Sequence, residues 1–150
     1  QGFSNDSAWA RGQAWGLYGY TMMYRMTGEQ RYLEQAVKIA EYILPHLPED
    51  AIPNWDFDAD VQMKDSSAGA IMASAFIELY GFTQNKEYLT MAERQLRSLA
   101  SDAYLAPLGE NGYFILKHGV GHLPANTEVD VPLSYGDYYF VEAAMRYLAL

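Results

Sequence analysis

Apolar residues recur at three- and four-residue spacing through most of the chain, which is the periodicity of amphipathic α-helices. The pattern predicts five helices, with Ser7, Ser66 or Ser67, and Ser134 as candidate N-terminal caps. Gly28 is expected to end the first helix, because glycine readily adopts the left-handed conformation of a C-terminal cap. The expected helices span about 8–26, 29–44, 67–80 and 87–101, and the last begins near 134, with Pro45 and Pro48 ending the second.

The predicted helices differ in kind. Residues 66–75, SSAGAIMASA, are small or apolar on every side, which indicates a helix surrounded by other helices. Residues 29–43, EQRYLEQAVKIAEYI, keep one polar face and are expected to lie outside. Alternation of inner and outer helices is what an α/α toroid requires.

An internal repeat supports this architecture. Residues 24–36 align with residues 80–92 at an offset of 56, and each copy is predicted to be a helical hairpin. Repeated hairpins indicate stacked helix pairs, either a solenoid or a closed toroid, and the period is too long for a tetratricopeptide array. The shared residues are Tyr24/Tyr80, Thr27/Thr83, Tyr32/Tyr88, Leu33/Leu89 and Ala36/Ala92.

Two long loops, about 47–65 and 105–133, precede the helices expected at Ser67 and Ser134. Residues 113–118, YFILKH, form a candidate short strand within the second loop. Long loops on one face of a rigid scaffold commonly carry function, so we expect the site at this end.

Composition narrows the classes of partner. Hydrophobic residues make up 50% of the chain, enough for a core, and the net charge of −9 with no basic cluster argues against nucleic acid. The absence of cysteine excludes disulfides and thiolate chemistry, and no apolar run has the roughly 20 residues of a membrane span. The 13 tyrosines suit a carbohydrate site and helix packing alike. Because the chain opens on Gln1, we expect a piece of a longer protein.

Residues 7–15, SAWARGQAW, are unusual for a helix start. Arg11 and Trp15 share a helix face, and Trp9 lies in the first turn. The helix dipole disfavours a cation there, so Arg11 needs a carboxylate partner, from a ligand or from a nearby residue such as Asp6. Two interpretations remain: a site for a flat anionic group, or a structural Arg–Asp pair between packing indoles.

Asp56, Asp58 and Asp60 resemble the start of a calcium-binding EF-hand loop, but Val61 replaces the required glycine and Ser67 the required glutamate. Calcium is therefore not expected. The aspartates are candidates for acid chemistry or sugar contacts. The favoured alternative is that they anchor the loop while its aromatic residues are buried.

His118 and His122 have a spacing that binds zinc on a helix, but Gly119 and Gly121 favour a loop, and no third ligand lies near. No metal is expected. His122 is a candidate substrate contact, with an ordinary loop histidine as the alternative. Asp137 either stabilises the start of the last helix or faces a cavity.

Four stretches, in this order, resemble glycoside hydrolase family 88, the unsaturated glucuronyl hydrolases: SAWARGQAWGLYGY, PNWDFDAD, KDSSAGAIMASAFIEL and VDVPLSYGDYYFVEAAMRYL. The resemblance covers essentially the whole chain. It implies an all-α fold, the (α/α)6 barrel of twelve helices, of which residues 1–150 would form the C-terminal portion of a single catalytic domain with about five helices. Inner-helix faces would then be exposed in the isolated chain.

The resemblance also implies an activity without a cofactor. Such enzymes hydrate the 4,5-double bond of an unsaturated uronic acid at the non-reducing end of lyase-generated oligosaccharides, with an Asp as proton donor. The family's catalytic Asp residues lie upstream of this chain, so the chain alone is expected to be inactive and to depend on the missing N-terminal part. The implied substrate-binding residues are Gln1, Trp9, Arg11, Trp15 and, as a substitute anion contact, His122.

Family members that bind sulfate carry two Ser and a Lys in the loop that closes over the substrate. Here those positions are His122, Ala125 and Thr127, so that mode of sulfate recognition is not expected. Two alternatives to a glucuronyl hydrolase remain open: a related unsaturated rhamnogalacturonyl hydrolase, and a non-catalytic helical-repeat interaction domain.

Overall fold

The structure is a computed structural model that describes all 150 residues, and it confirms the five expected helices. A two-stranded hairpin precedes the last helix. The elements are α1 (Ala10–Thr27), α2 (Gln30–His46), α3 (Ser66–Thr83), α4 (Lys86–Leu99), the 3-10 turn η1 (Asn111–Tyr113), β1 (Gly119–His122), the 3-10 turn η2 (Leu123–Ala125), β2 (Thr127–Val131) and α5 (Ser134–Leu148).

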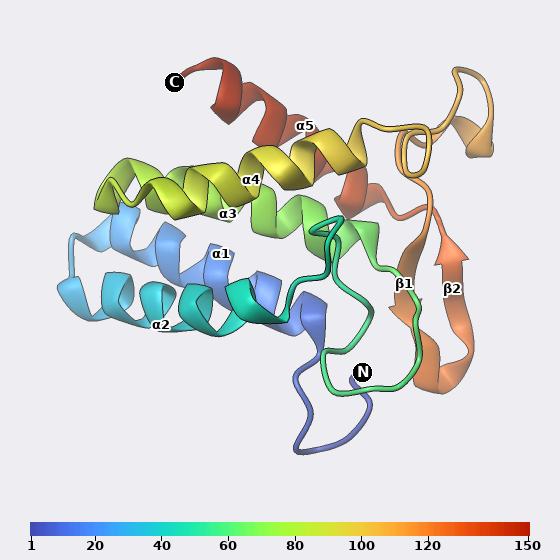
Figure 1. Cartoon of the computed structure of the whole chain (residues 1–150), viewed down its shortest axis with the longest axis horizontal. Helices are drawn as coiled ribbons and strands as arrows, with labels where there is room; N and C mark the ends of the chain where they lie inside the picture. The colour runs from blue at the N-terminus through green and yellow to red at the C-terminus, as the bar shows by residue number, and fades with distance from the viewer.

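The helices form two layers (Figure 1). Helices α1, α3 and α5 run in the same direction, with α3 packed between the other two, whereas α2 and α4 run the opposite way. Helix α2 pairs with α1 and α4 pairs with α3, so each successive hairpin contributes one helix to each layer. This is the alternation of inner and outer helices that the sequence predicts.

Helix α3 is the centre of the core. Every residue from Ser66 to Ile77 is buried, as its uniformly small and apolar sequence predicts. The outer helix α2 instead buries a single stripe formed by Leu33, Ala36, Ala40 and Ile43, and keeps its polar face in solvent.

The helix caps differ from the expectation. Asp65, not a serine, caps α3, and its carboxylate accepts a hydrogen bond from the Ser67 N–H. Trp9 and Leu133 occupy the N-cap positions of α1 and α5 and make no side-chain cap bond. The Ser7 hydroxyl, expected to cap α1, donates instead to Asp56, 2.8 Å away, and the Ala10 N–H at the start of α1 donates to the Trp55 carbonyl at 3.0 Å.

Helix α1 ends at Gly28, which has the expected left-handed conformation. Helix α2 continues through Pro45 to His46, slightly beyond the expected end. Pro45 lacks the N–H that would bond to the carbonyl four residues earlier, and the helix ends one residue after it.

The prediction of a strand at 113–118 was wrong. Strands β1 and β2 lie further along, at the segment expected to be a loop because of Gly119 and Gly121. Both glycines are needed for close packing in the hairpin. A β-carbon at Gly119 would lie 2.7 Å from Leu133, and one at Gly121 would lie 2.2 Å from the carboxylate of Glu128.

None of the five helices combines the length and apolar character needed to cross a membrane.

One face of α5 has no helical partner, as expected of an incomplete toroid. Tyr138, Met145 and Leu148 on this helix are 61%, 67% and 84% exposed. The face includes an apolar cavity of about 710 Å³. Since α5 packs chiefly on α3, its opposite side is left open.

A polar network joins the three inner helices. The hydroxyls of Tyr18 and Ser74 donate to the two carboxylate oxygens of Glu142, at 3.1 and 2.5 Å. Arg146 donates to Glu78 at 2.7 Å. The groups come from α1, α3 and α5, so the network fixes the rotation of these helices relative to one another.

We expect this network to make the fold sensitive to alkali. Burial and the Glu142 carboxylate raise the pKa of Tyr18 from 10.0 to about 12. Between these values the unfolded chain loses the tyrosine proton while the folded chain keeps it, so stability present below pH 10 is lost as pH rises. Urea unfolding followed by circular dichroism should show that the free energy of unfolding declines with pH above 10. Tyr18→Phe should make this decline less steep. Tyr113→Phe, at an exposed loop position, should leave the slope unchanged; an equal slope in all three proteins would contradict the assignment.

Candidate functional site

The inner helices all begin at one end of the molecule. The N-termini of α1, α3 and α5 lie beside the hairpin and the 47–65 loop (Figure 1). Unpaired N–H groups give each helix N-terminus a partial positive charge. This end therefore favours an anion, although the whole chain carries a net charge of −9.

Arg11 lies at the centre of this end and is only 4% exposed. Its guanidinium forms an ion pair with the Asp65 carboxylate at 3.2 Å. It also donates to the Val120 carbonyl and, at 2.6 Å, to the Gly121 carbonyl. Asp6, the candidate partner named from the sequence, is exposed on the N-terminal segment, and the partner is Asp65, which approaches from the start of α3.

The guanidinium is flanked by two aromatic rings. Its central carbon lies 4.8 Å from the ring centroid of Trp9 and 5.2 Å from that of Tyr135. Three of the five N–H groups of Arg11 are engaged by protein acceptors, which leaves the Nε–H and one Nη2–H. Arg11 thus has a structural role, and two of its donors have no protein acceptor.

Trp15 lies one turn further along α1 and is joined to this cluster by Tyr135. Its ring centroid is 6.3 Å from Tyr135 and 5.2 Å from Tyr139. Trp15 is half-buried and borders a small apolar hollow with Gly16 and Gly19. Trp9 and Tyr135 thus both contact the guanidinium, and Tyr135 in turn lies beside Trp15.

Gln1 is exposed, and its backbone carbonyl accepts a hydrogen bond from the Trp55 indole at 3.0 Å. Asp56 holds the same N-terminal segment, because its carboxylate accepts from the Phe3 N–H at 2.9 Å as well as from Ser7. Asp58 accepts from the Ala8 N–H at 2.7 Å. The loop-anchoring interpretation of Asp56 and Asp58 is confirmed.

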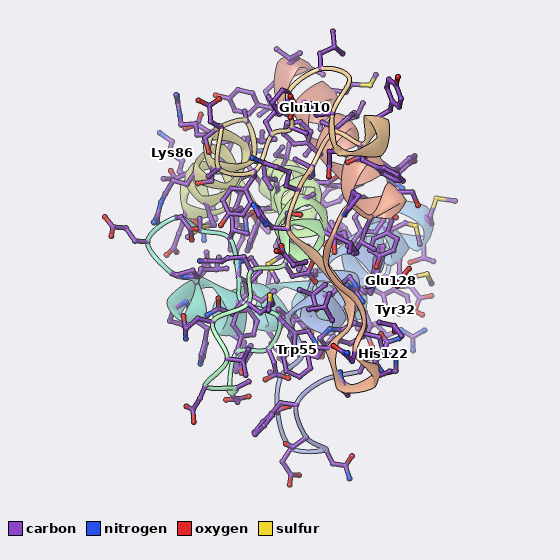
Figure 2. The ribbon with its side chains drawn as sticks, turned by 90° about the vertical axis from the view of Figure 1, so that its right-hand side faces the viewer. Tyr32, Trp55, Lys86, Glu110, His122 and Glu128 are labelled. Atoms are coloured by element: carbon purple, nitrogen blue, oxygen red, sulfur yellow. The ribbon has the colours of Figure 1, made fainter.

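The hairpin faces the viewer in Figure 2, with His122 at the end of β1 and Glu128 on β2. His122 is half-buried, and its neighbour Gly121 is the residue that Arg11 holds. His118 is directed elsewhere, because its ring nitrogen contacts Asp130 at 2.6 Å. Of the two histidines, the structure brings only His122 next to a residue bonded to Arg11.

Asp137 fastens a loop to the first turn of α5. Its two carboxylate oxygens accept from the N–H groups of Ile115 and Leu116, at 2.8 and 2.9 Å. It also borders the cavity on α5, as one of the two interpretations from the sequence expected, and its carboxylate bonds the 115–116 backbone rather than an N–H group of α5.

Sequence reasoning missed Tyr135 as part of the site and the pairing of Asp65 with Arg11. Burial raises the pKa of Tyr135, and the nearby Arg11 opposes this effect. Asp65 is fully buried; burial raises the pKa of its carboxyl, and Arg11 and Ser67 act against this shift. Asp65 stands directly before two serines and an apolar run, and this pattern could have identified it as the N-cap of α3. No local signal connects Tyr135 to Arg11, which lies 124 residues away.

Comparisons with known proteins identify relatives along nearly the whole chain. No family model matches the chain. An unsaturated glucuronyl hydrolase of Formosa agariphila is 50% identical over an alignment of 151 positions. The alignment covers 97% of this chain and 38% of that protein. An unsaturated chondroitin disaccharide hydrolase of Streptococcus pyogenes is 36% identical over 98% of this chain and 39% of its own length.

Solved structures give the same result. The crystal structure of an unsaturated glucuronyl hydrolase specific for heparin superposes with a TM-score of 0.96 at 50% identity, over 99% of this chain and 42% of that one. The unsaturated glucuronyl hydrolase of Bacillus sp. GL1 superposes with a TM-score of 0.91 at 30% identity, and 41% of it is covered. In sequence and in fold, therefore, the chain matches one part of the unsaturated glucuronyl hydrolases, and it spans about two fifths of the length of the relatives it matches.

Proposed function

We propose that the chain is the substrate-binding, C-terminal portion of an enzyme that hydrates the 4,5-double bond of unsaturated uronic acids in glycosaminoglycan-derived oligosaccharides. The observation that carries the proposal is the guanidinium of Arg11, held between the Trp9 and Tyr135 rings with two N–H groups unengaged. Nearly the whole of this chain superposes on a part of a relative that is specific for heparin.

The ligand must present a carboxylate close to a flat ring, and an unsaturated uronic acid does so. Arg11 is suited to the carboxylate, because guanidinium donors in a plane match its two oxygens. Trp9 and Trp15 offer apolar ring faces for the sugar. A related protein of Streptococcus agalactiae, 33% identical to this chain, was crystallised with dGlcA-GalNAc6S, which supports this class of substrate.

The residues at the edge of the site would refine this binding. His122, half-buried on the hairpin, would contact a polar or anionic group of the sugar that follows the uronic acid. Gln1 would contact the uronic acid from the N-terminal segment, whose position Asp56 and Trp55 fix.

The proton donor of the reaction would come from the rest of the enzyme. Asp56, Asp58, Asp65 and Asp137 all accept hydrogen bonds from backbone N–H groups of the fold. These four carboxylates therefore hold segments of the fold together. This supports a chain that binds substrate but does not itself carry the catalytic acid.

The test is the ultraviolet absorbance of the conjugated double bond. We expect the longer protein to abolish the absorbance of an unsaturated heparin or chondroitin disaccharide, and the 150-residue chain alone to leave it unchanged. Activity of the isolated chain would contradict the proposal. Faster turnover of an unsaturated rhamnogalacturonyl disaccharide would favour that related hydrolase, and no turnover of any of them would favour a non-catalytic domain.

Within the active protein, Trp9→Leu is expected to lower kcat/KM by roughly one to two orders of magnitude, because it removes a ring that faces the sugar and flanks Arg11. Tyr113→Ala is the matched control, since Tyr113 is an exposed aromatic residue on a loop outside the cluster. The control should retain the wild-type value. Equal kinetics for both variants would remove Trp9 from the site.

A further inference from the structure

The hairpin leaves one edge of β1 without a strand partner. Strand β1 pairs with β2 along its other edge only. The free edge faces the starts of α1 and α3, and Val120 at its centre is fully buried. Buried backbone N–H and C=O groups need hydrogen-bond partners, so something must replace the missing strand.

Side chains fill this place. The Val120 N–H donates to the Asp65 carboxylate at 3.3 Å, and Arg11 donates to the carbonyls of Val120 and Gly121. Next to them, the Ser66 N–H donates to the His118 carbonyl at 3.0 Å. The Asp65 carboxylate, as acceptor, and the Arg11 guanidinium, as donor, thus bond to the free edge of β1 as the backbone of a third strand would.

Asp65 is the common member of these contacts. One of its oxygens accepts from the Ser67 N–H and hydroxyl at 3.1 and 2.6 Å and from Val120, and the other pairs with Arg11. It therefore caps α3, orients the guanidinium on α1 and holds β1 at the same time. Without the negative charge, the guanidinium loses the group that fixes its direction toward β1.

The hairpin needs such support. Its strands have four and five residues, and the pairing is irregular between Gly119 and Val120. Glu128 and Asp130 on β2 have positive φ angles of 53° and 55°, which are unfavourable for residues with a side chain. Short two-stranded ribbons have little stability of their own.

We propose that Asp65 is a positioning residue: with Arg11 it takes the place of a third strand and holds the β1–β2 hairpin, and with it His122, at the substrate end. The consequence for catalysis rests on the function proposed above. The consequence for the hairpin does not, because it concerns only contacts within this chain.

The first test is amide hydrogen exchange in the full-length protein. In Asp65→Asn, the amides of Val120 and Gly121 should exchange at least roughly tenfold faster than in the wild type, while those in the middle of α3 keep their protection. The matched control is Asp130→Asn, which removes an exposed carboxylate from the same hairpin. Unchanged exchange at Val120 in Asp65→Asn would overturn the proposal, and so would equal acceleration in both variants.

The second test separates positioning from general destabilisation. For Asp65→Asn, KM for the unsaturated disaccharide should rise about tenfold while kcat changes less than about threefold, as expected when ground-state and transition-state binding weaken alike. Ile71→Val, which loses a buried methyl group in α3, is the stability control and should keep the wild-type KM. Asp65→Glu, which keeps the charge, should recover part of the lost affinity.

The outcomes distinguish the two proposals. If the wild-type protein turns over no unsaturated disaccharide, the proposed function fails and hydrogen exchange alone decides the role of Asp65. If the wild type is active but Asp65→Asn lowers only kcat, or changes KM no more than Ile71→Val, the positioning role is wrong.

Discussion

Replacing Arg11 by methionine is expected to lower the free energy of unfolding by about 3–5 kcal/mol, the usual cost of removing one member of a buried ion pair. The substitution leaves the carboxylate of Asp65, which is fully buried, without its counter-charge. It also leaves the carbonyls of Val120 and Gly121 without their donor. Urea unfolding followed by far-ultraviolet circular dichroism measures the loss.

The control for this effect is Arg31→Met. Arg31 pairs with Glu29 at 2.7 Å, but both side chains are largely exposed, so the pair contributes at most about 1 kcal/mol. Similar losses in the two variants would show that burial does not dominate the Arg11 pair. The double variant Arg11→Met with Asp65→Asn should lose less than the sum of the two single losses, because the contacts are shared.

Replacing Phe76 by alanine is expected to cost about 3–5 kcal/mol, the range for deleting a buried aromatic side chain. Phe76 is completely buried in the middle of α3 and stacks on Tyr88 of α4, with ring centroids 5.9 Å apart. The cavity would lie where the inner helix meets the outer helix of its own hairpin. The midpoint of thermal or urea unfolding reports the change.

Phe82→Ala, near the end of the same helix, is the matched comparison. Phe82 is 38% exposed and makes one edge-on contact with Tyr24, with ring centroids 5.0 Å apart. Its loss should cost about 1 kcal/mol, as a partly exposed aromatic pair does. If the Phe76 variant were no less stable than the Phe82 variant, α3 would not be the centre of the core.

The position of α3 also explains how the site is built. Because α3 is packed on several sides, it fixes the starts of α1 and α5 beside its own N-terminus. Trp9, Arg11 and Tyr135 meet at that point from two helices that are distant in sequence. Binding groups carried on rigid elements keep their geometry better than groups carried on loops alone.

Local sequence pattern predicted the helices well. The small, apolar run from Ser66 onward identified the inner helix, and the left-handed stop at Gly28 marked the end of α1. The family resemblance identified Trp9 and Arg11 as candidate site residues. The helix predictions succeeded because helix periodicity and glycine conformation depend on residues within one or two turns.

Local pattern failed where partners are distant in sequence. The glycines around Val120 favoured a loop, yet they permit a hairpin because Glu128 and Leu133 pack where β-carbons would lie. Asp6 was the nearest acidic neighbour of Arg11 along the chain, but Asp65 is its partner in space. Neither outcome follows from spacing alone.

The sequence by itself determined the helical class, the alternation of inner and outer helices, and the residues at the start of α1 that carry the family resemblance. Only the tertiary structure decided what Arg11 contacts. Its charge at a helix N-terminus required an acidic partner, but which carboxylate and which carbonyls could reach it depended on how α3 and the hairpin pack against α1. A buried charge is stable only where several elements converge on it, and that convergence is a property of the folded chain.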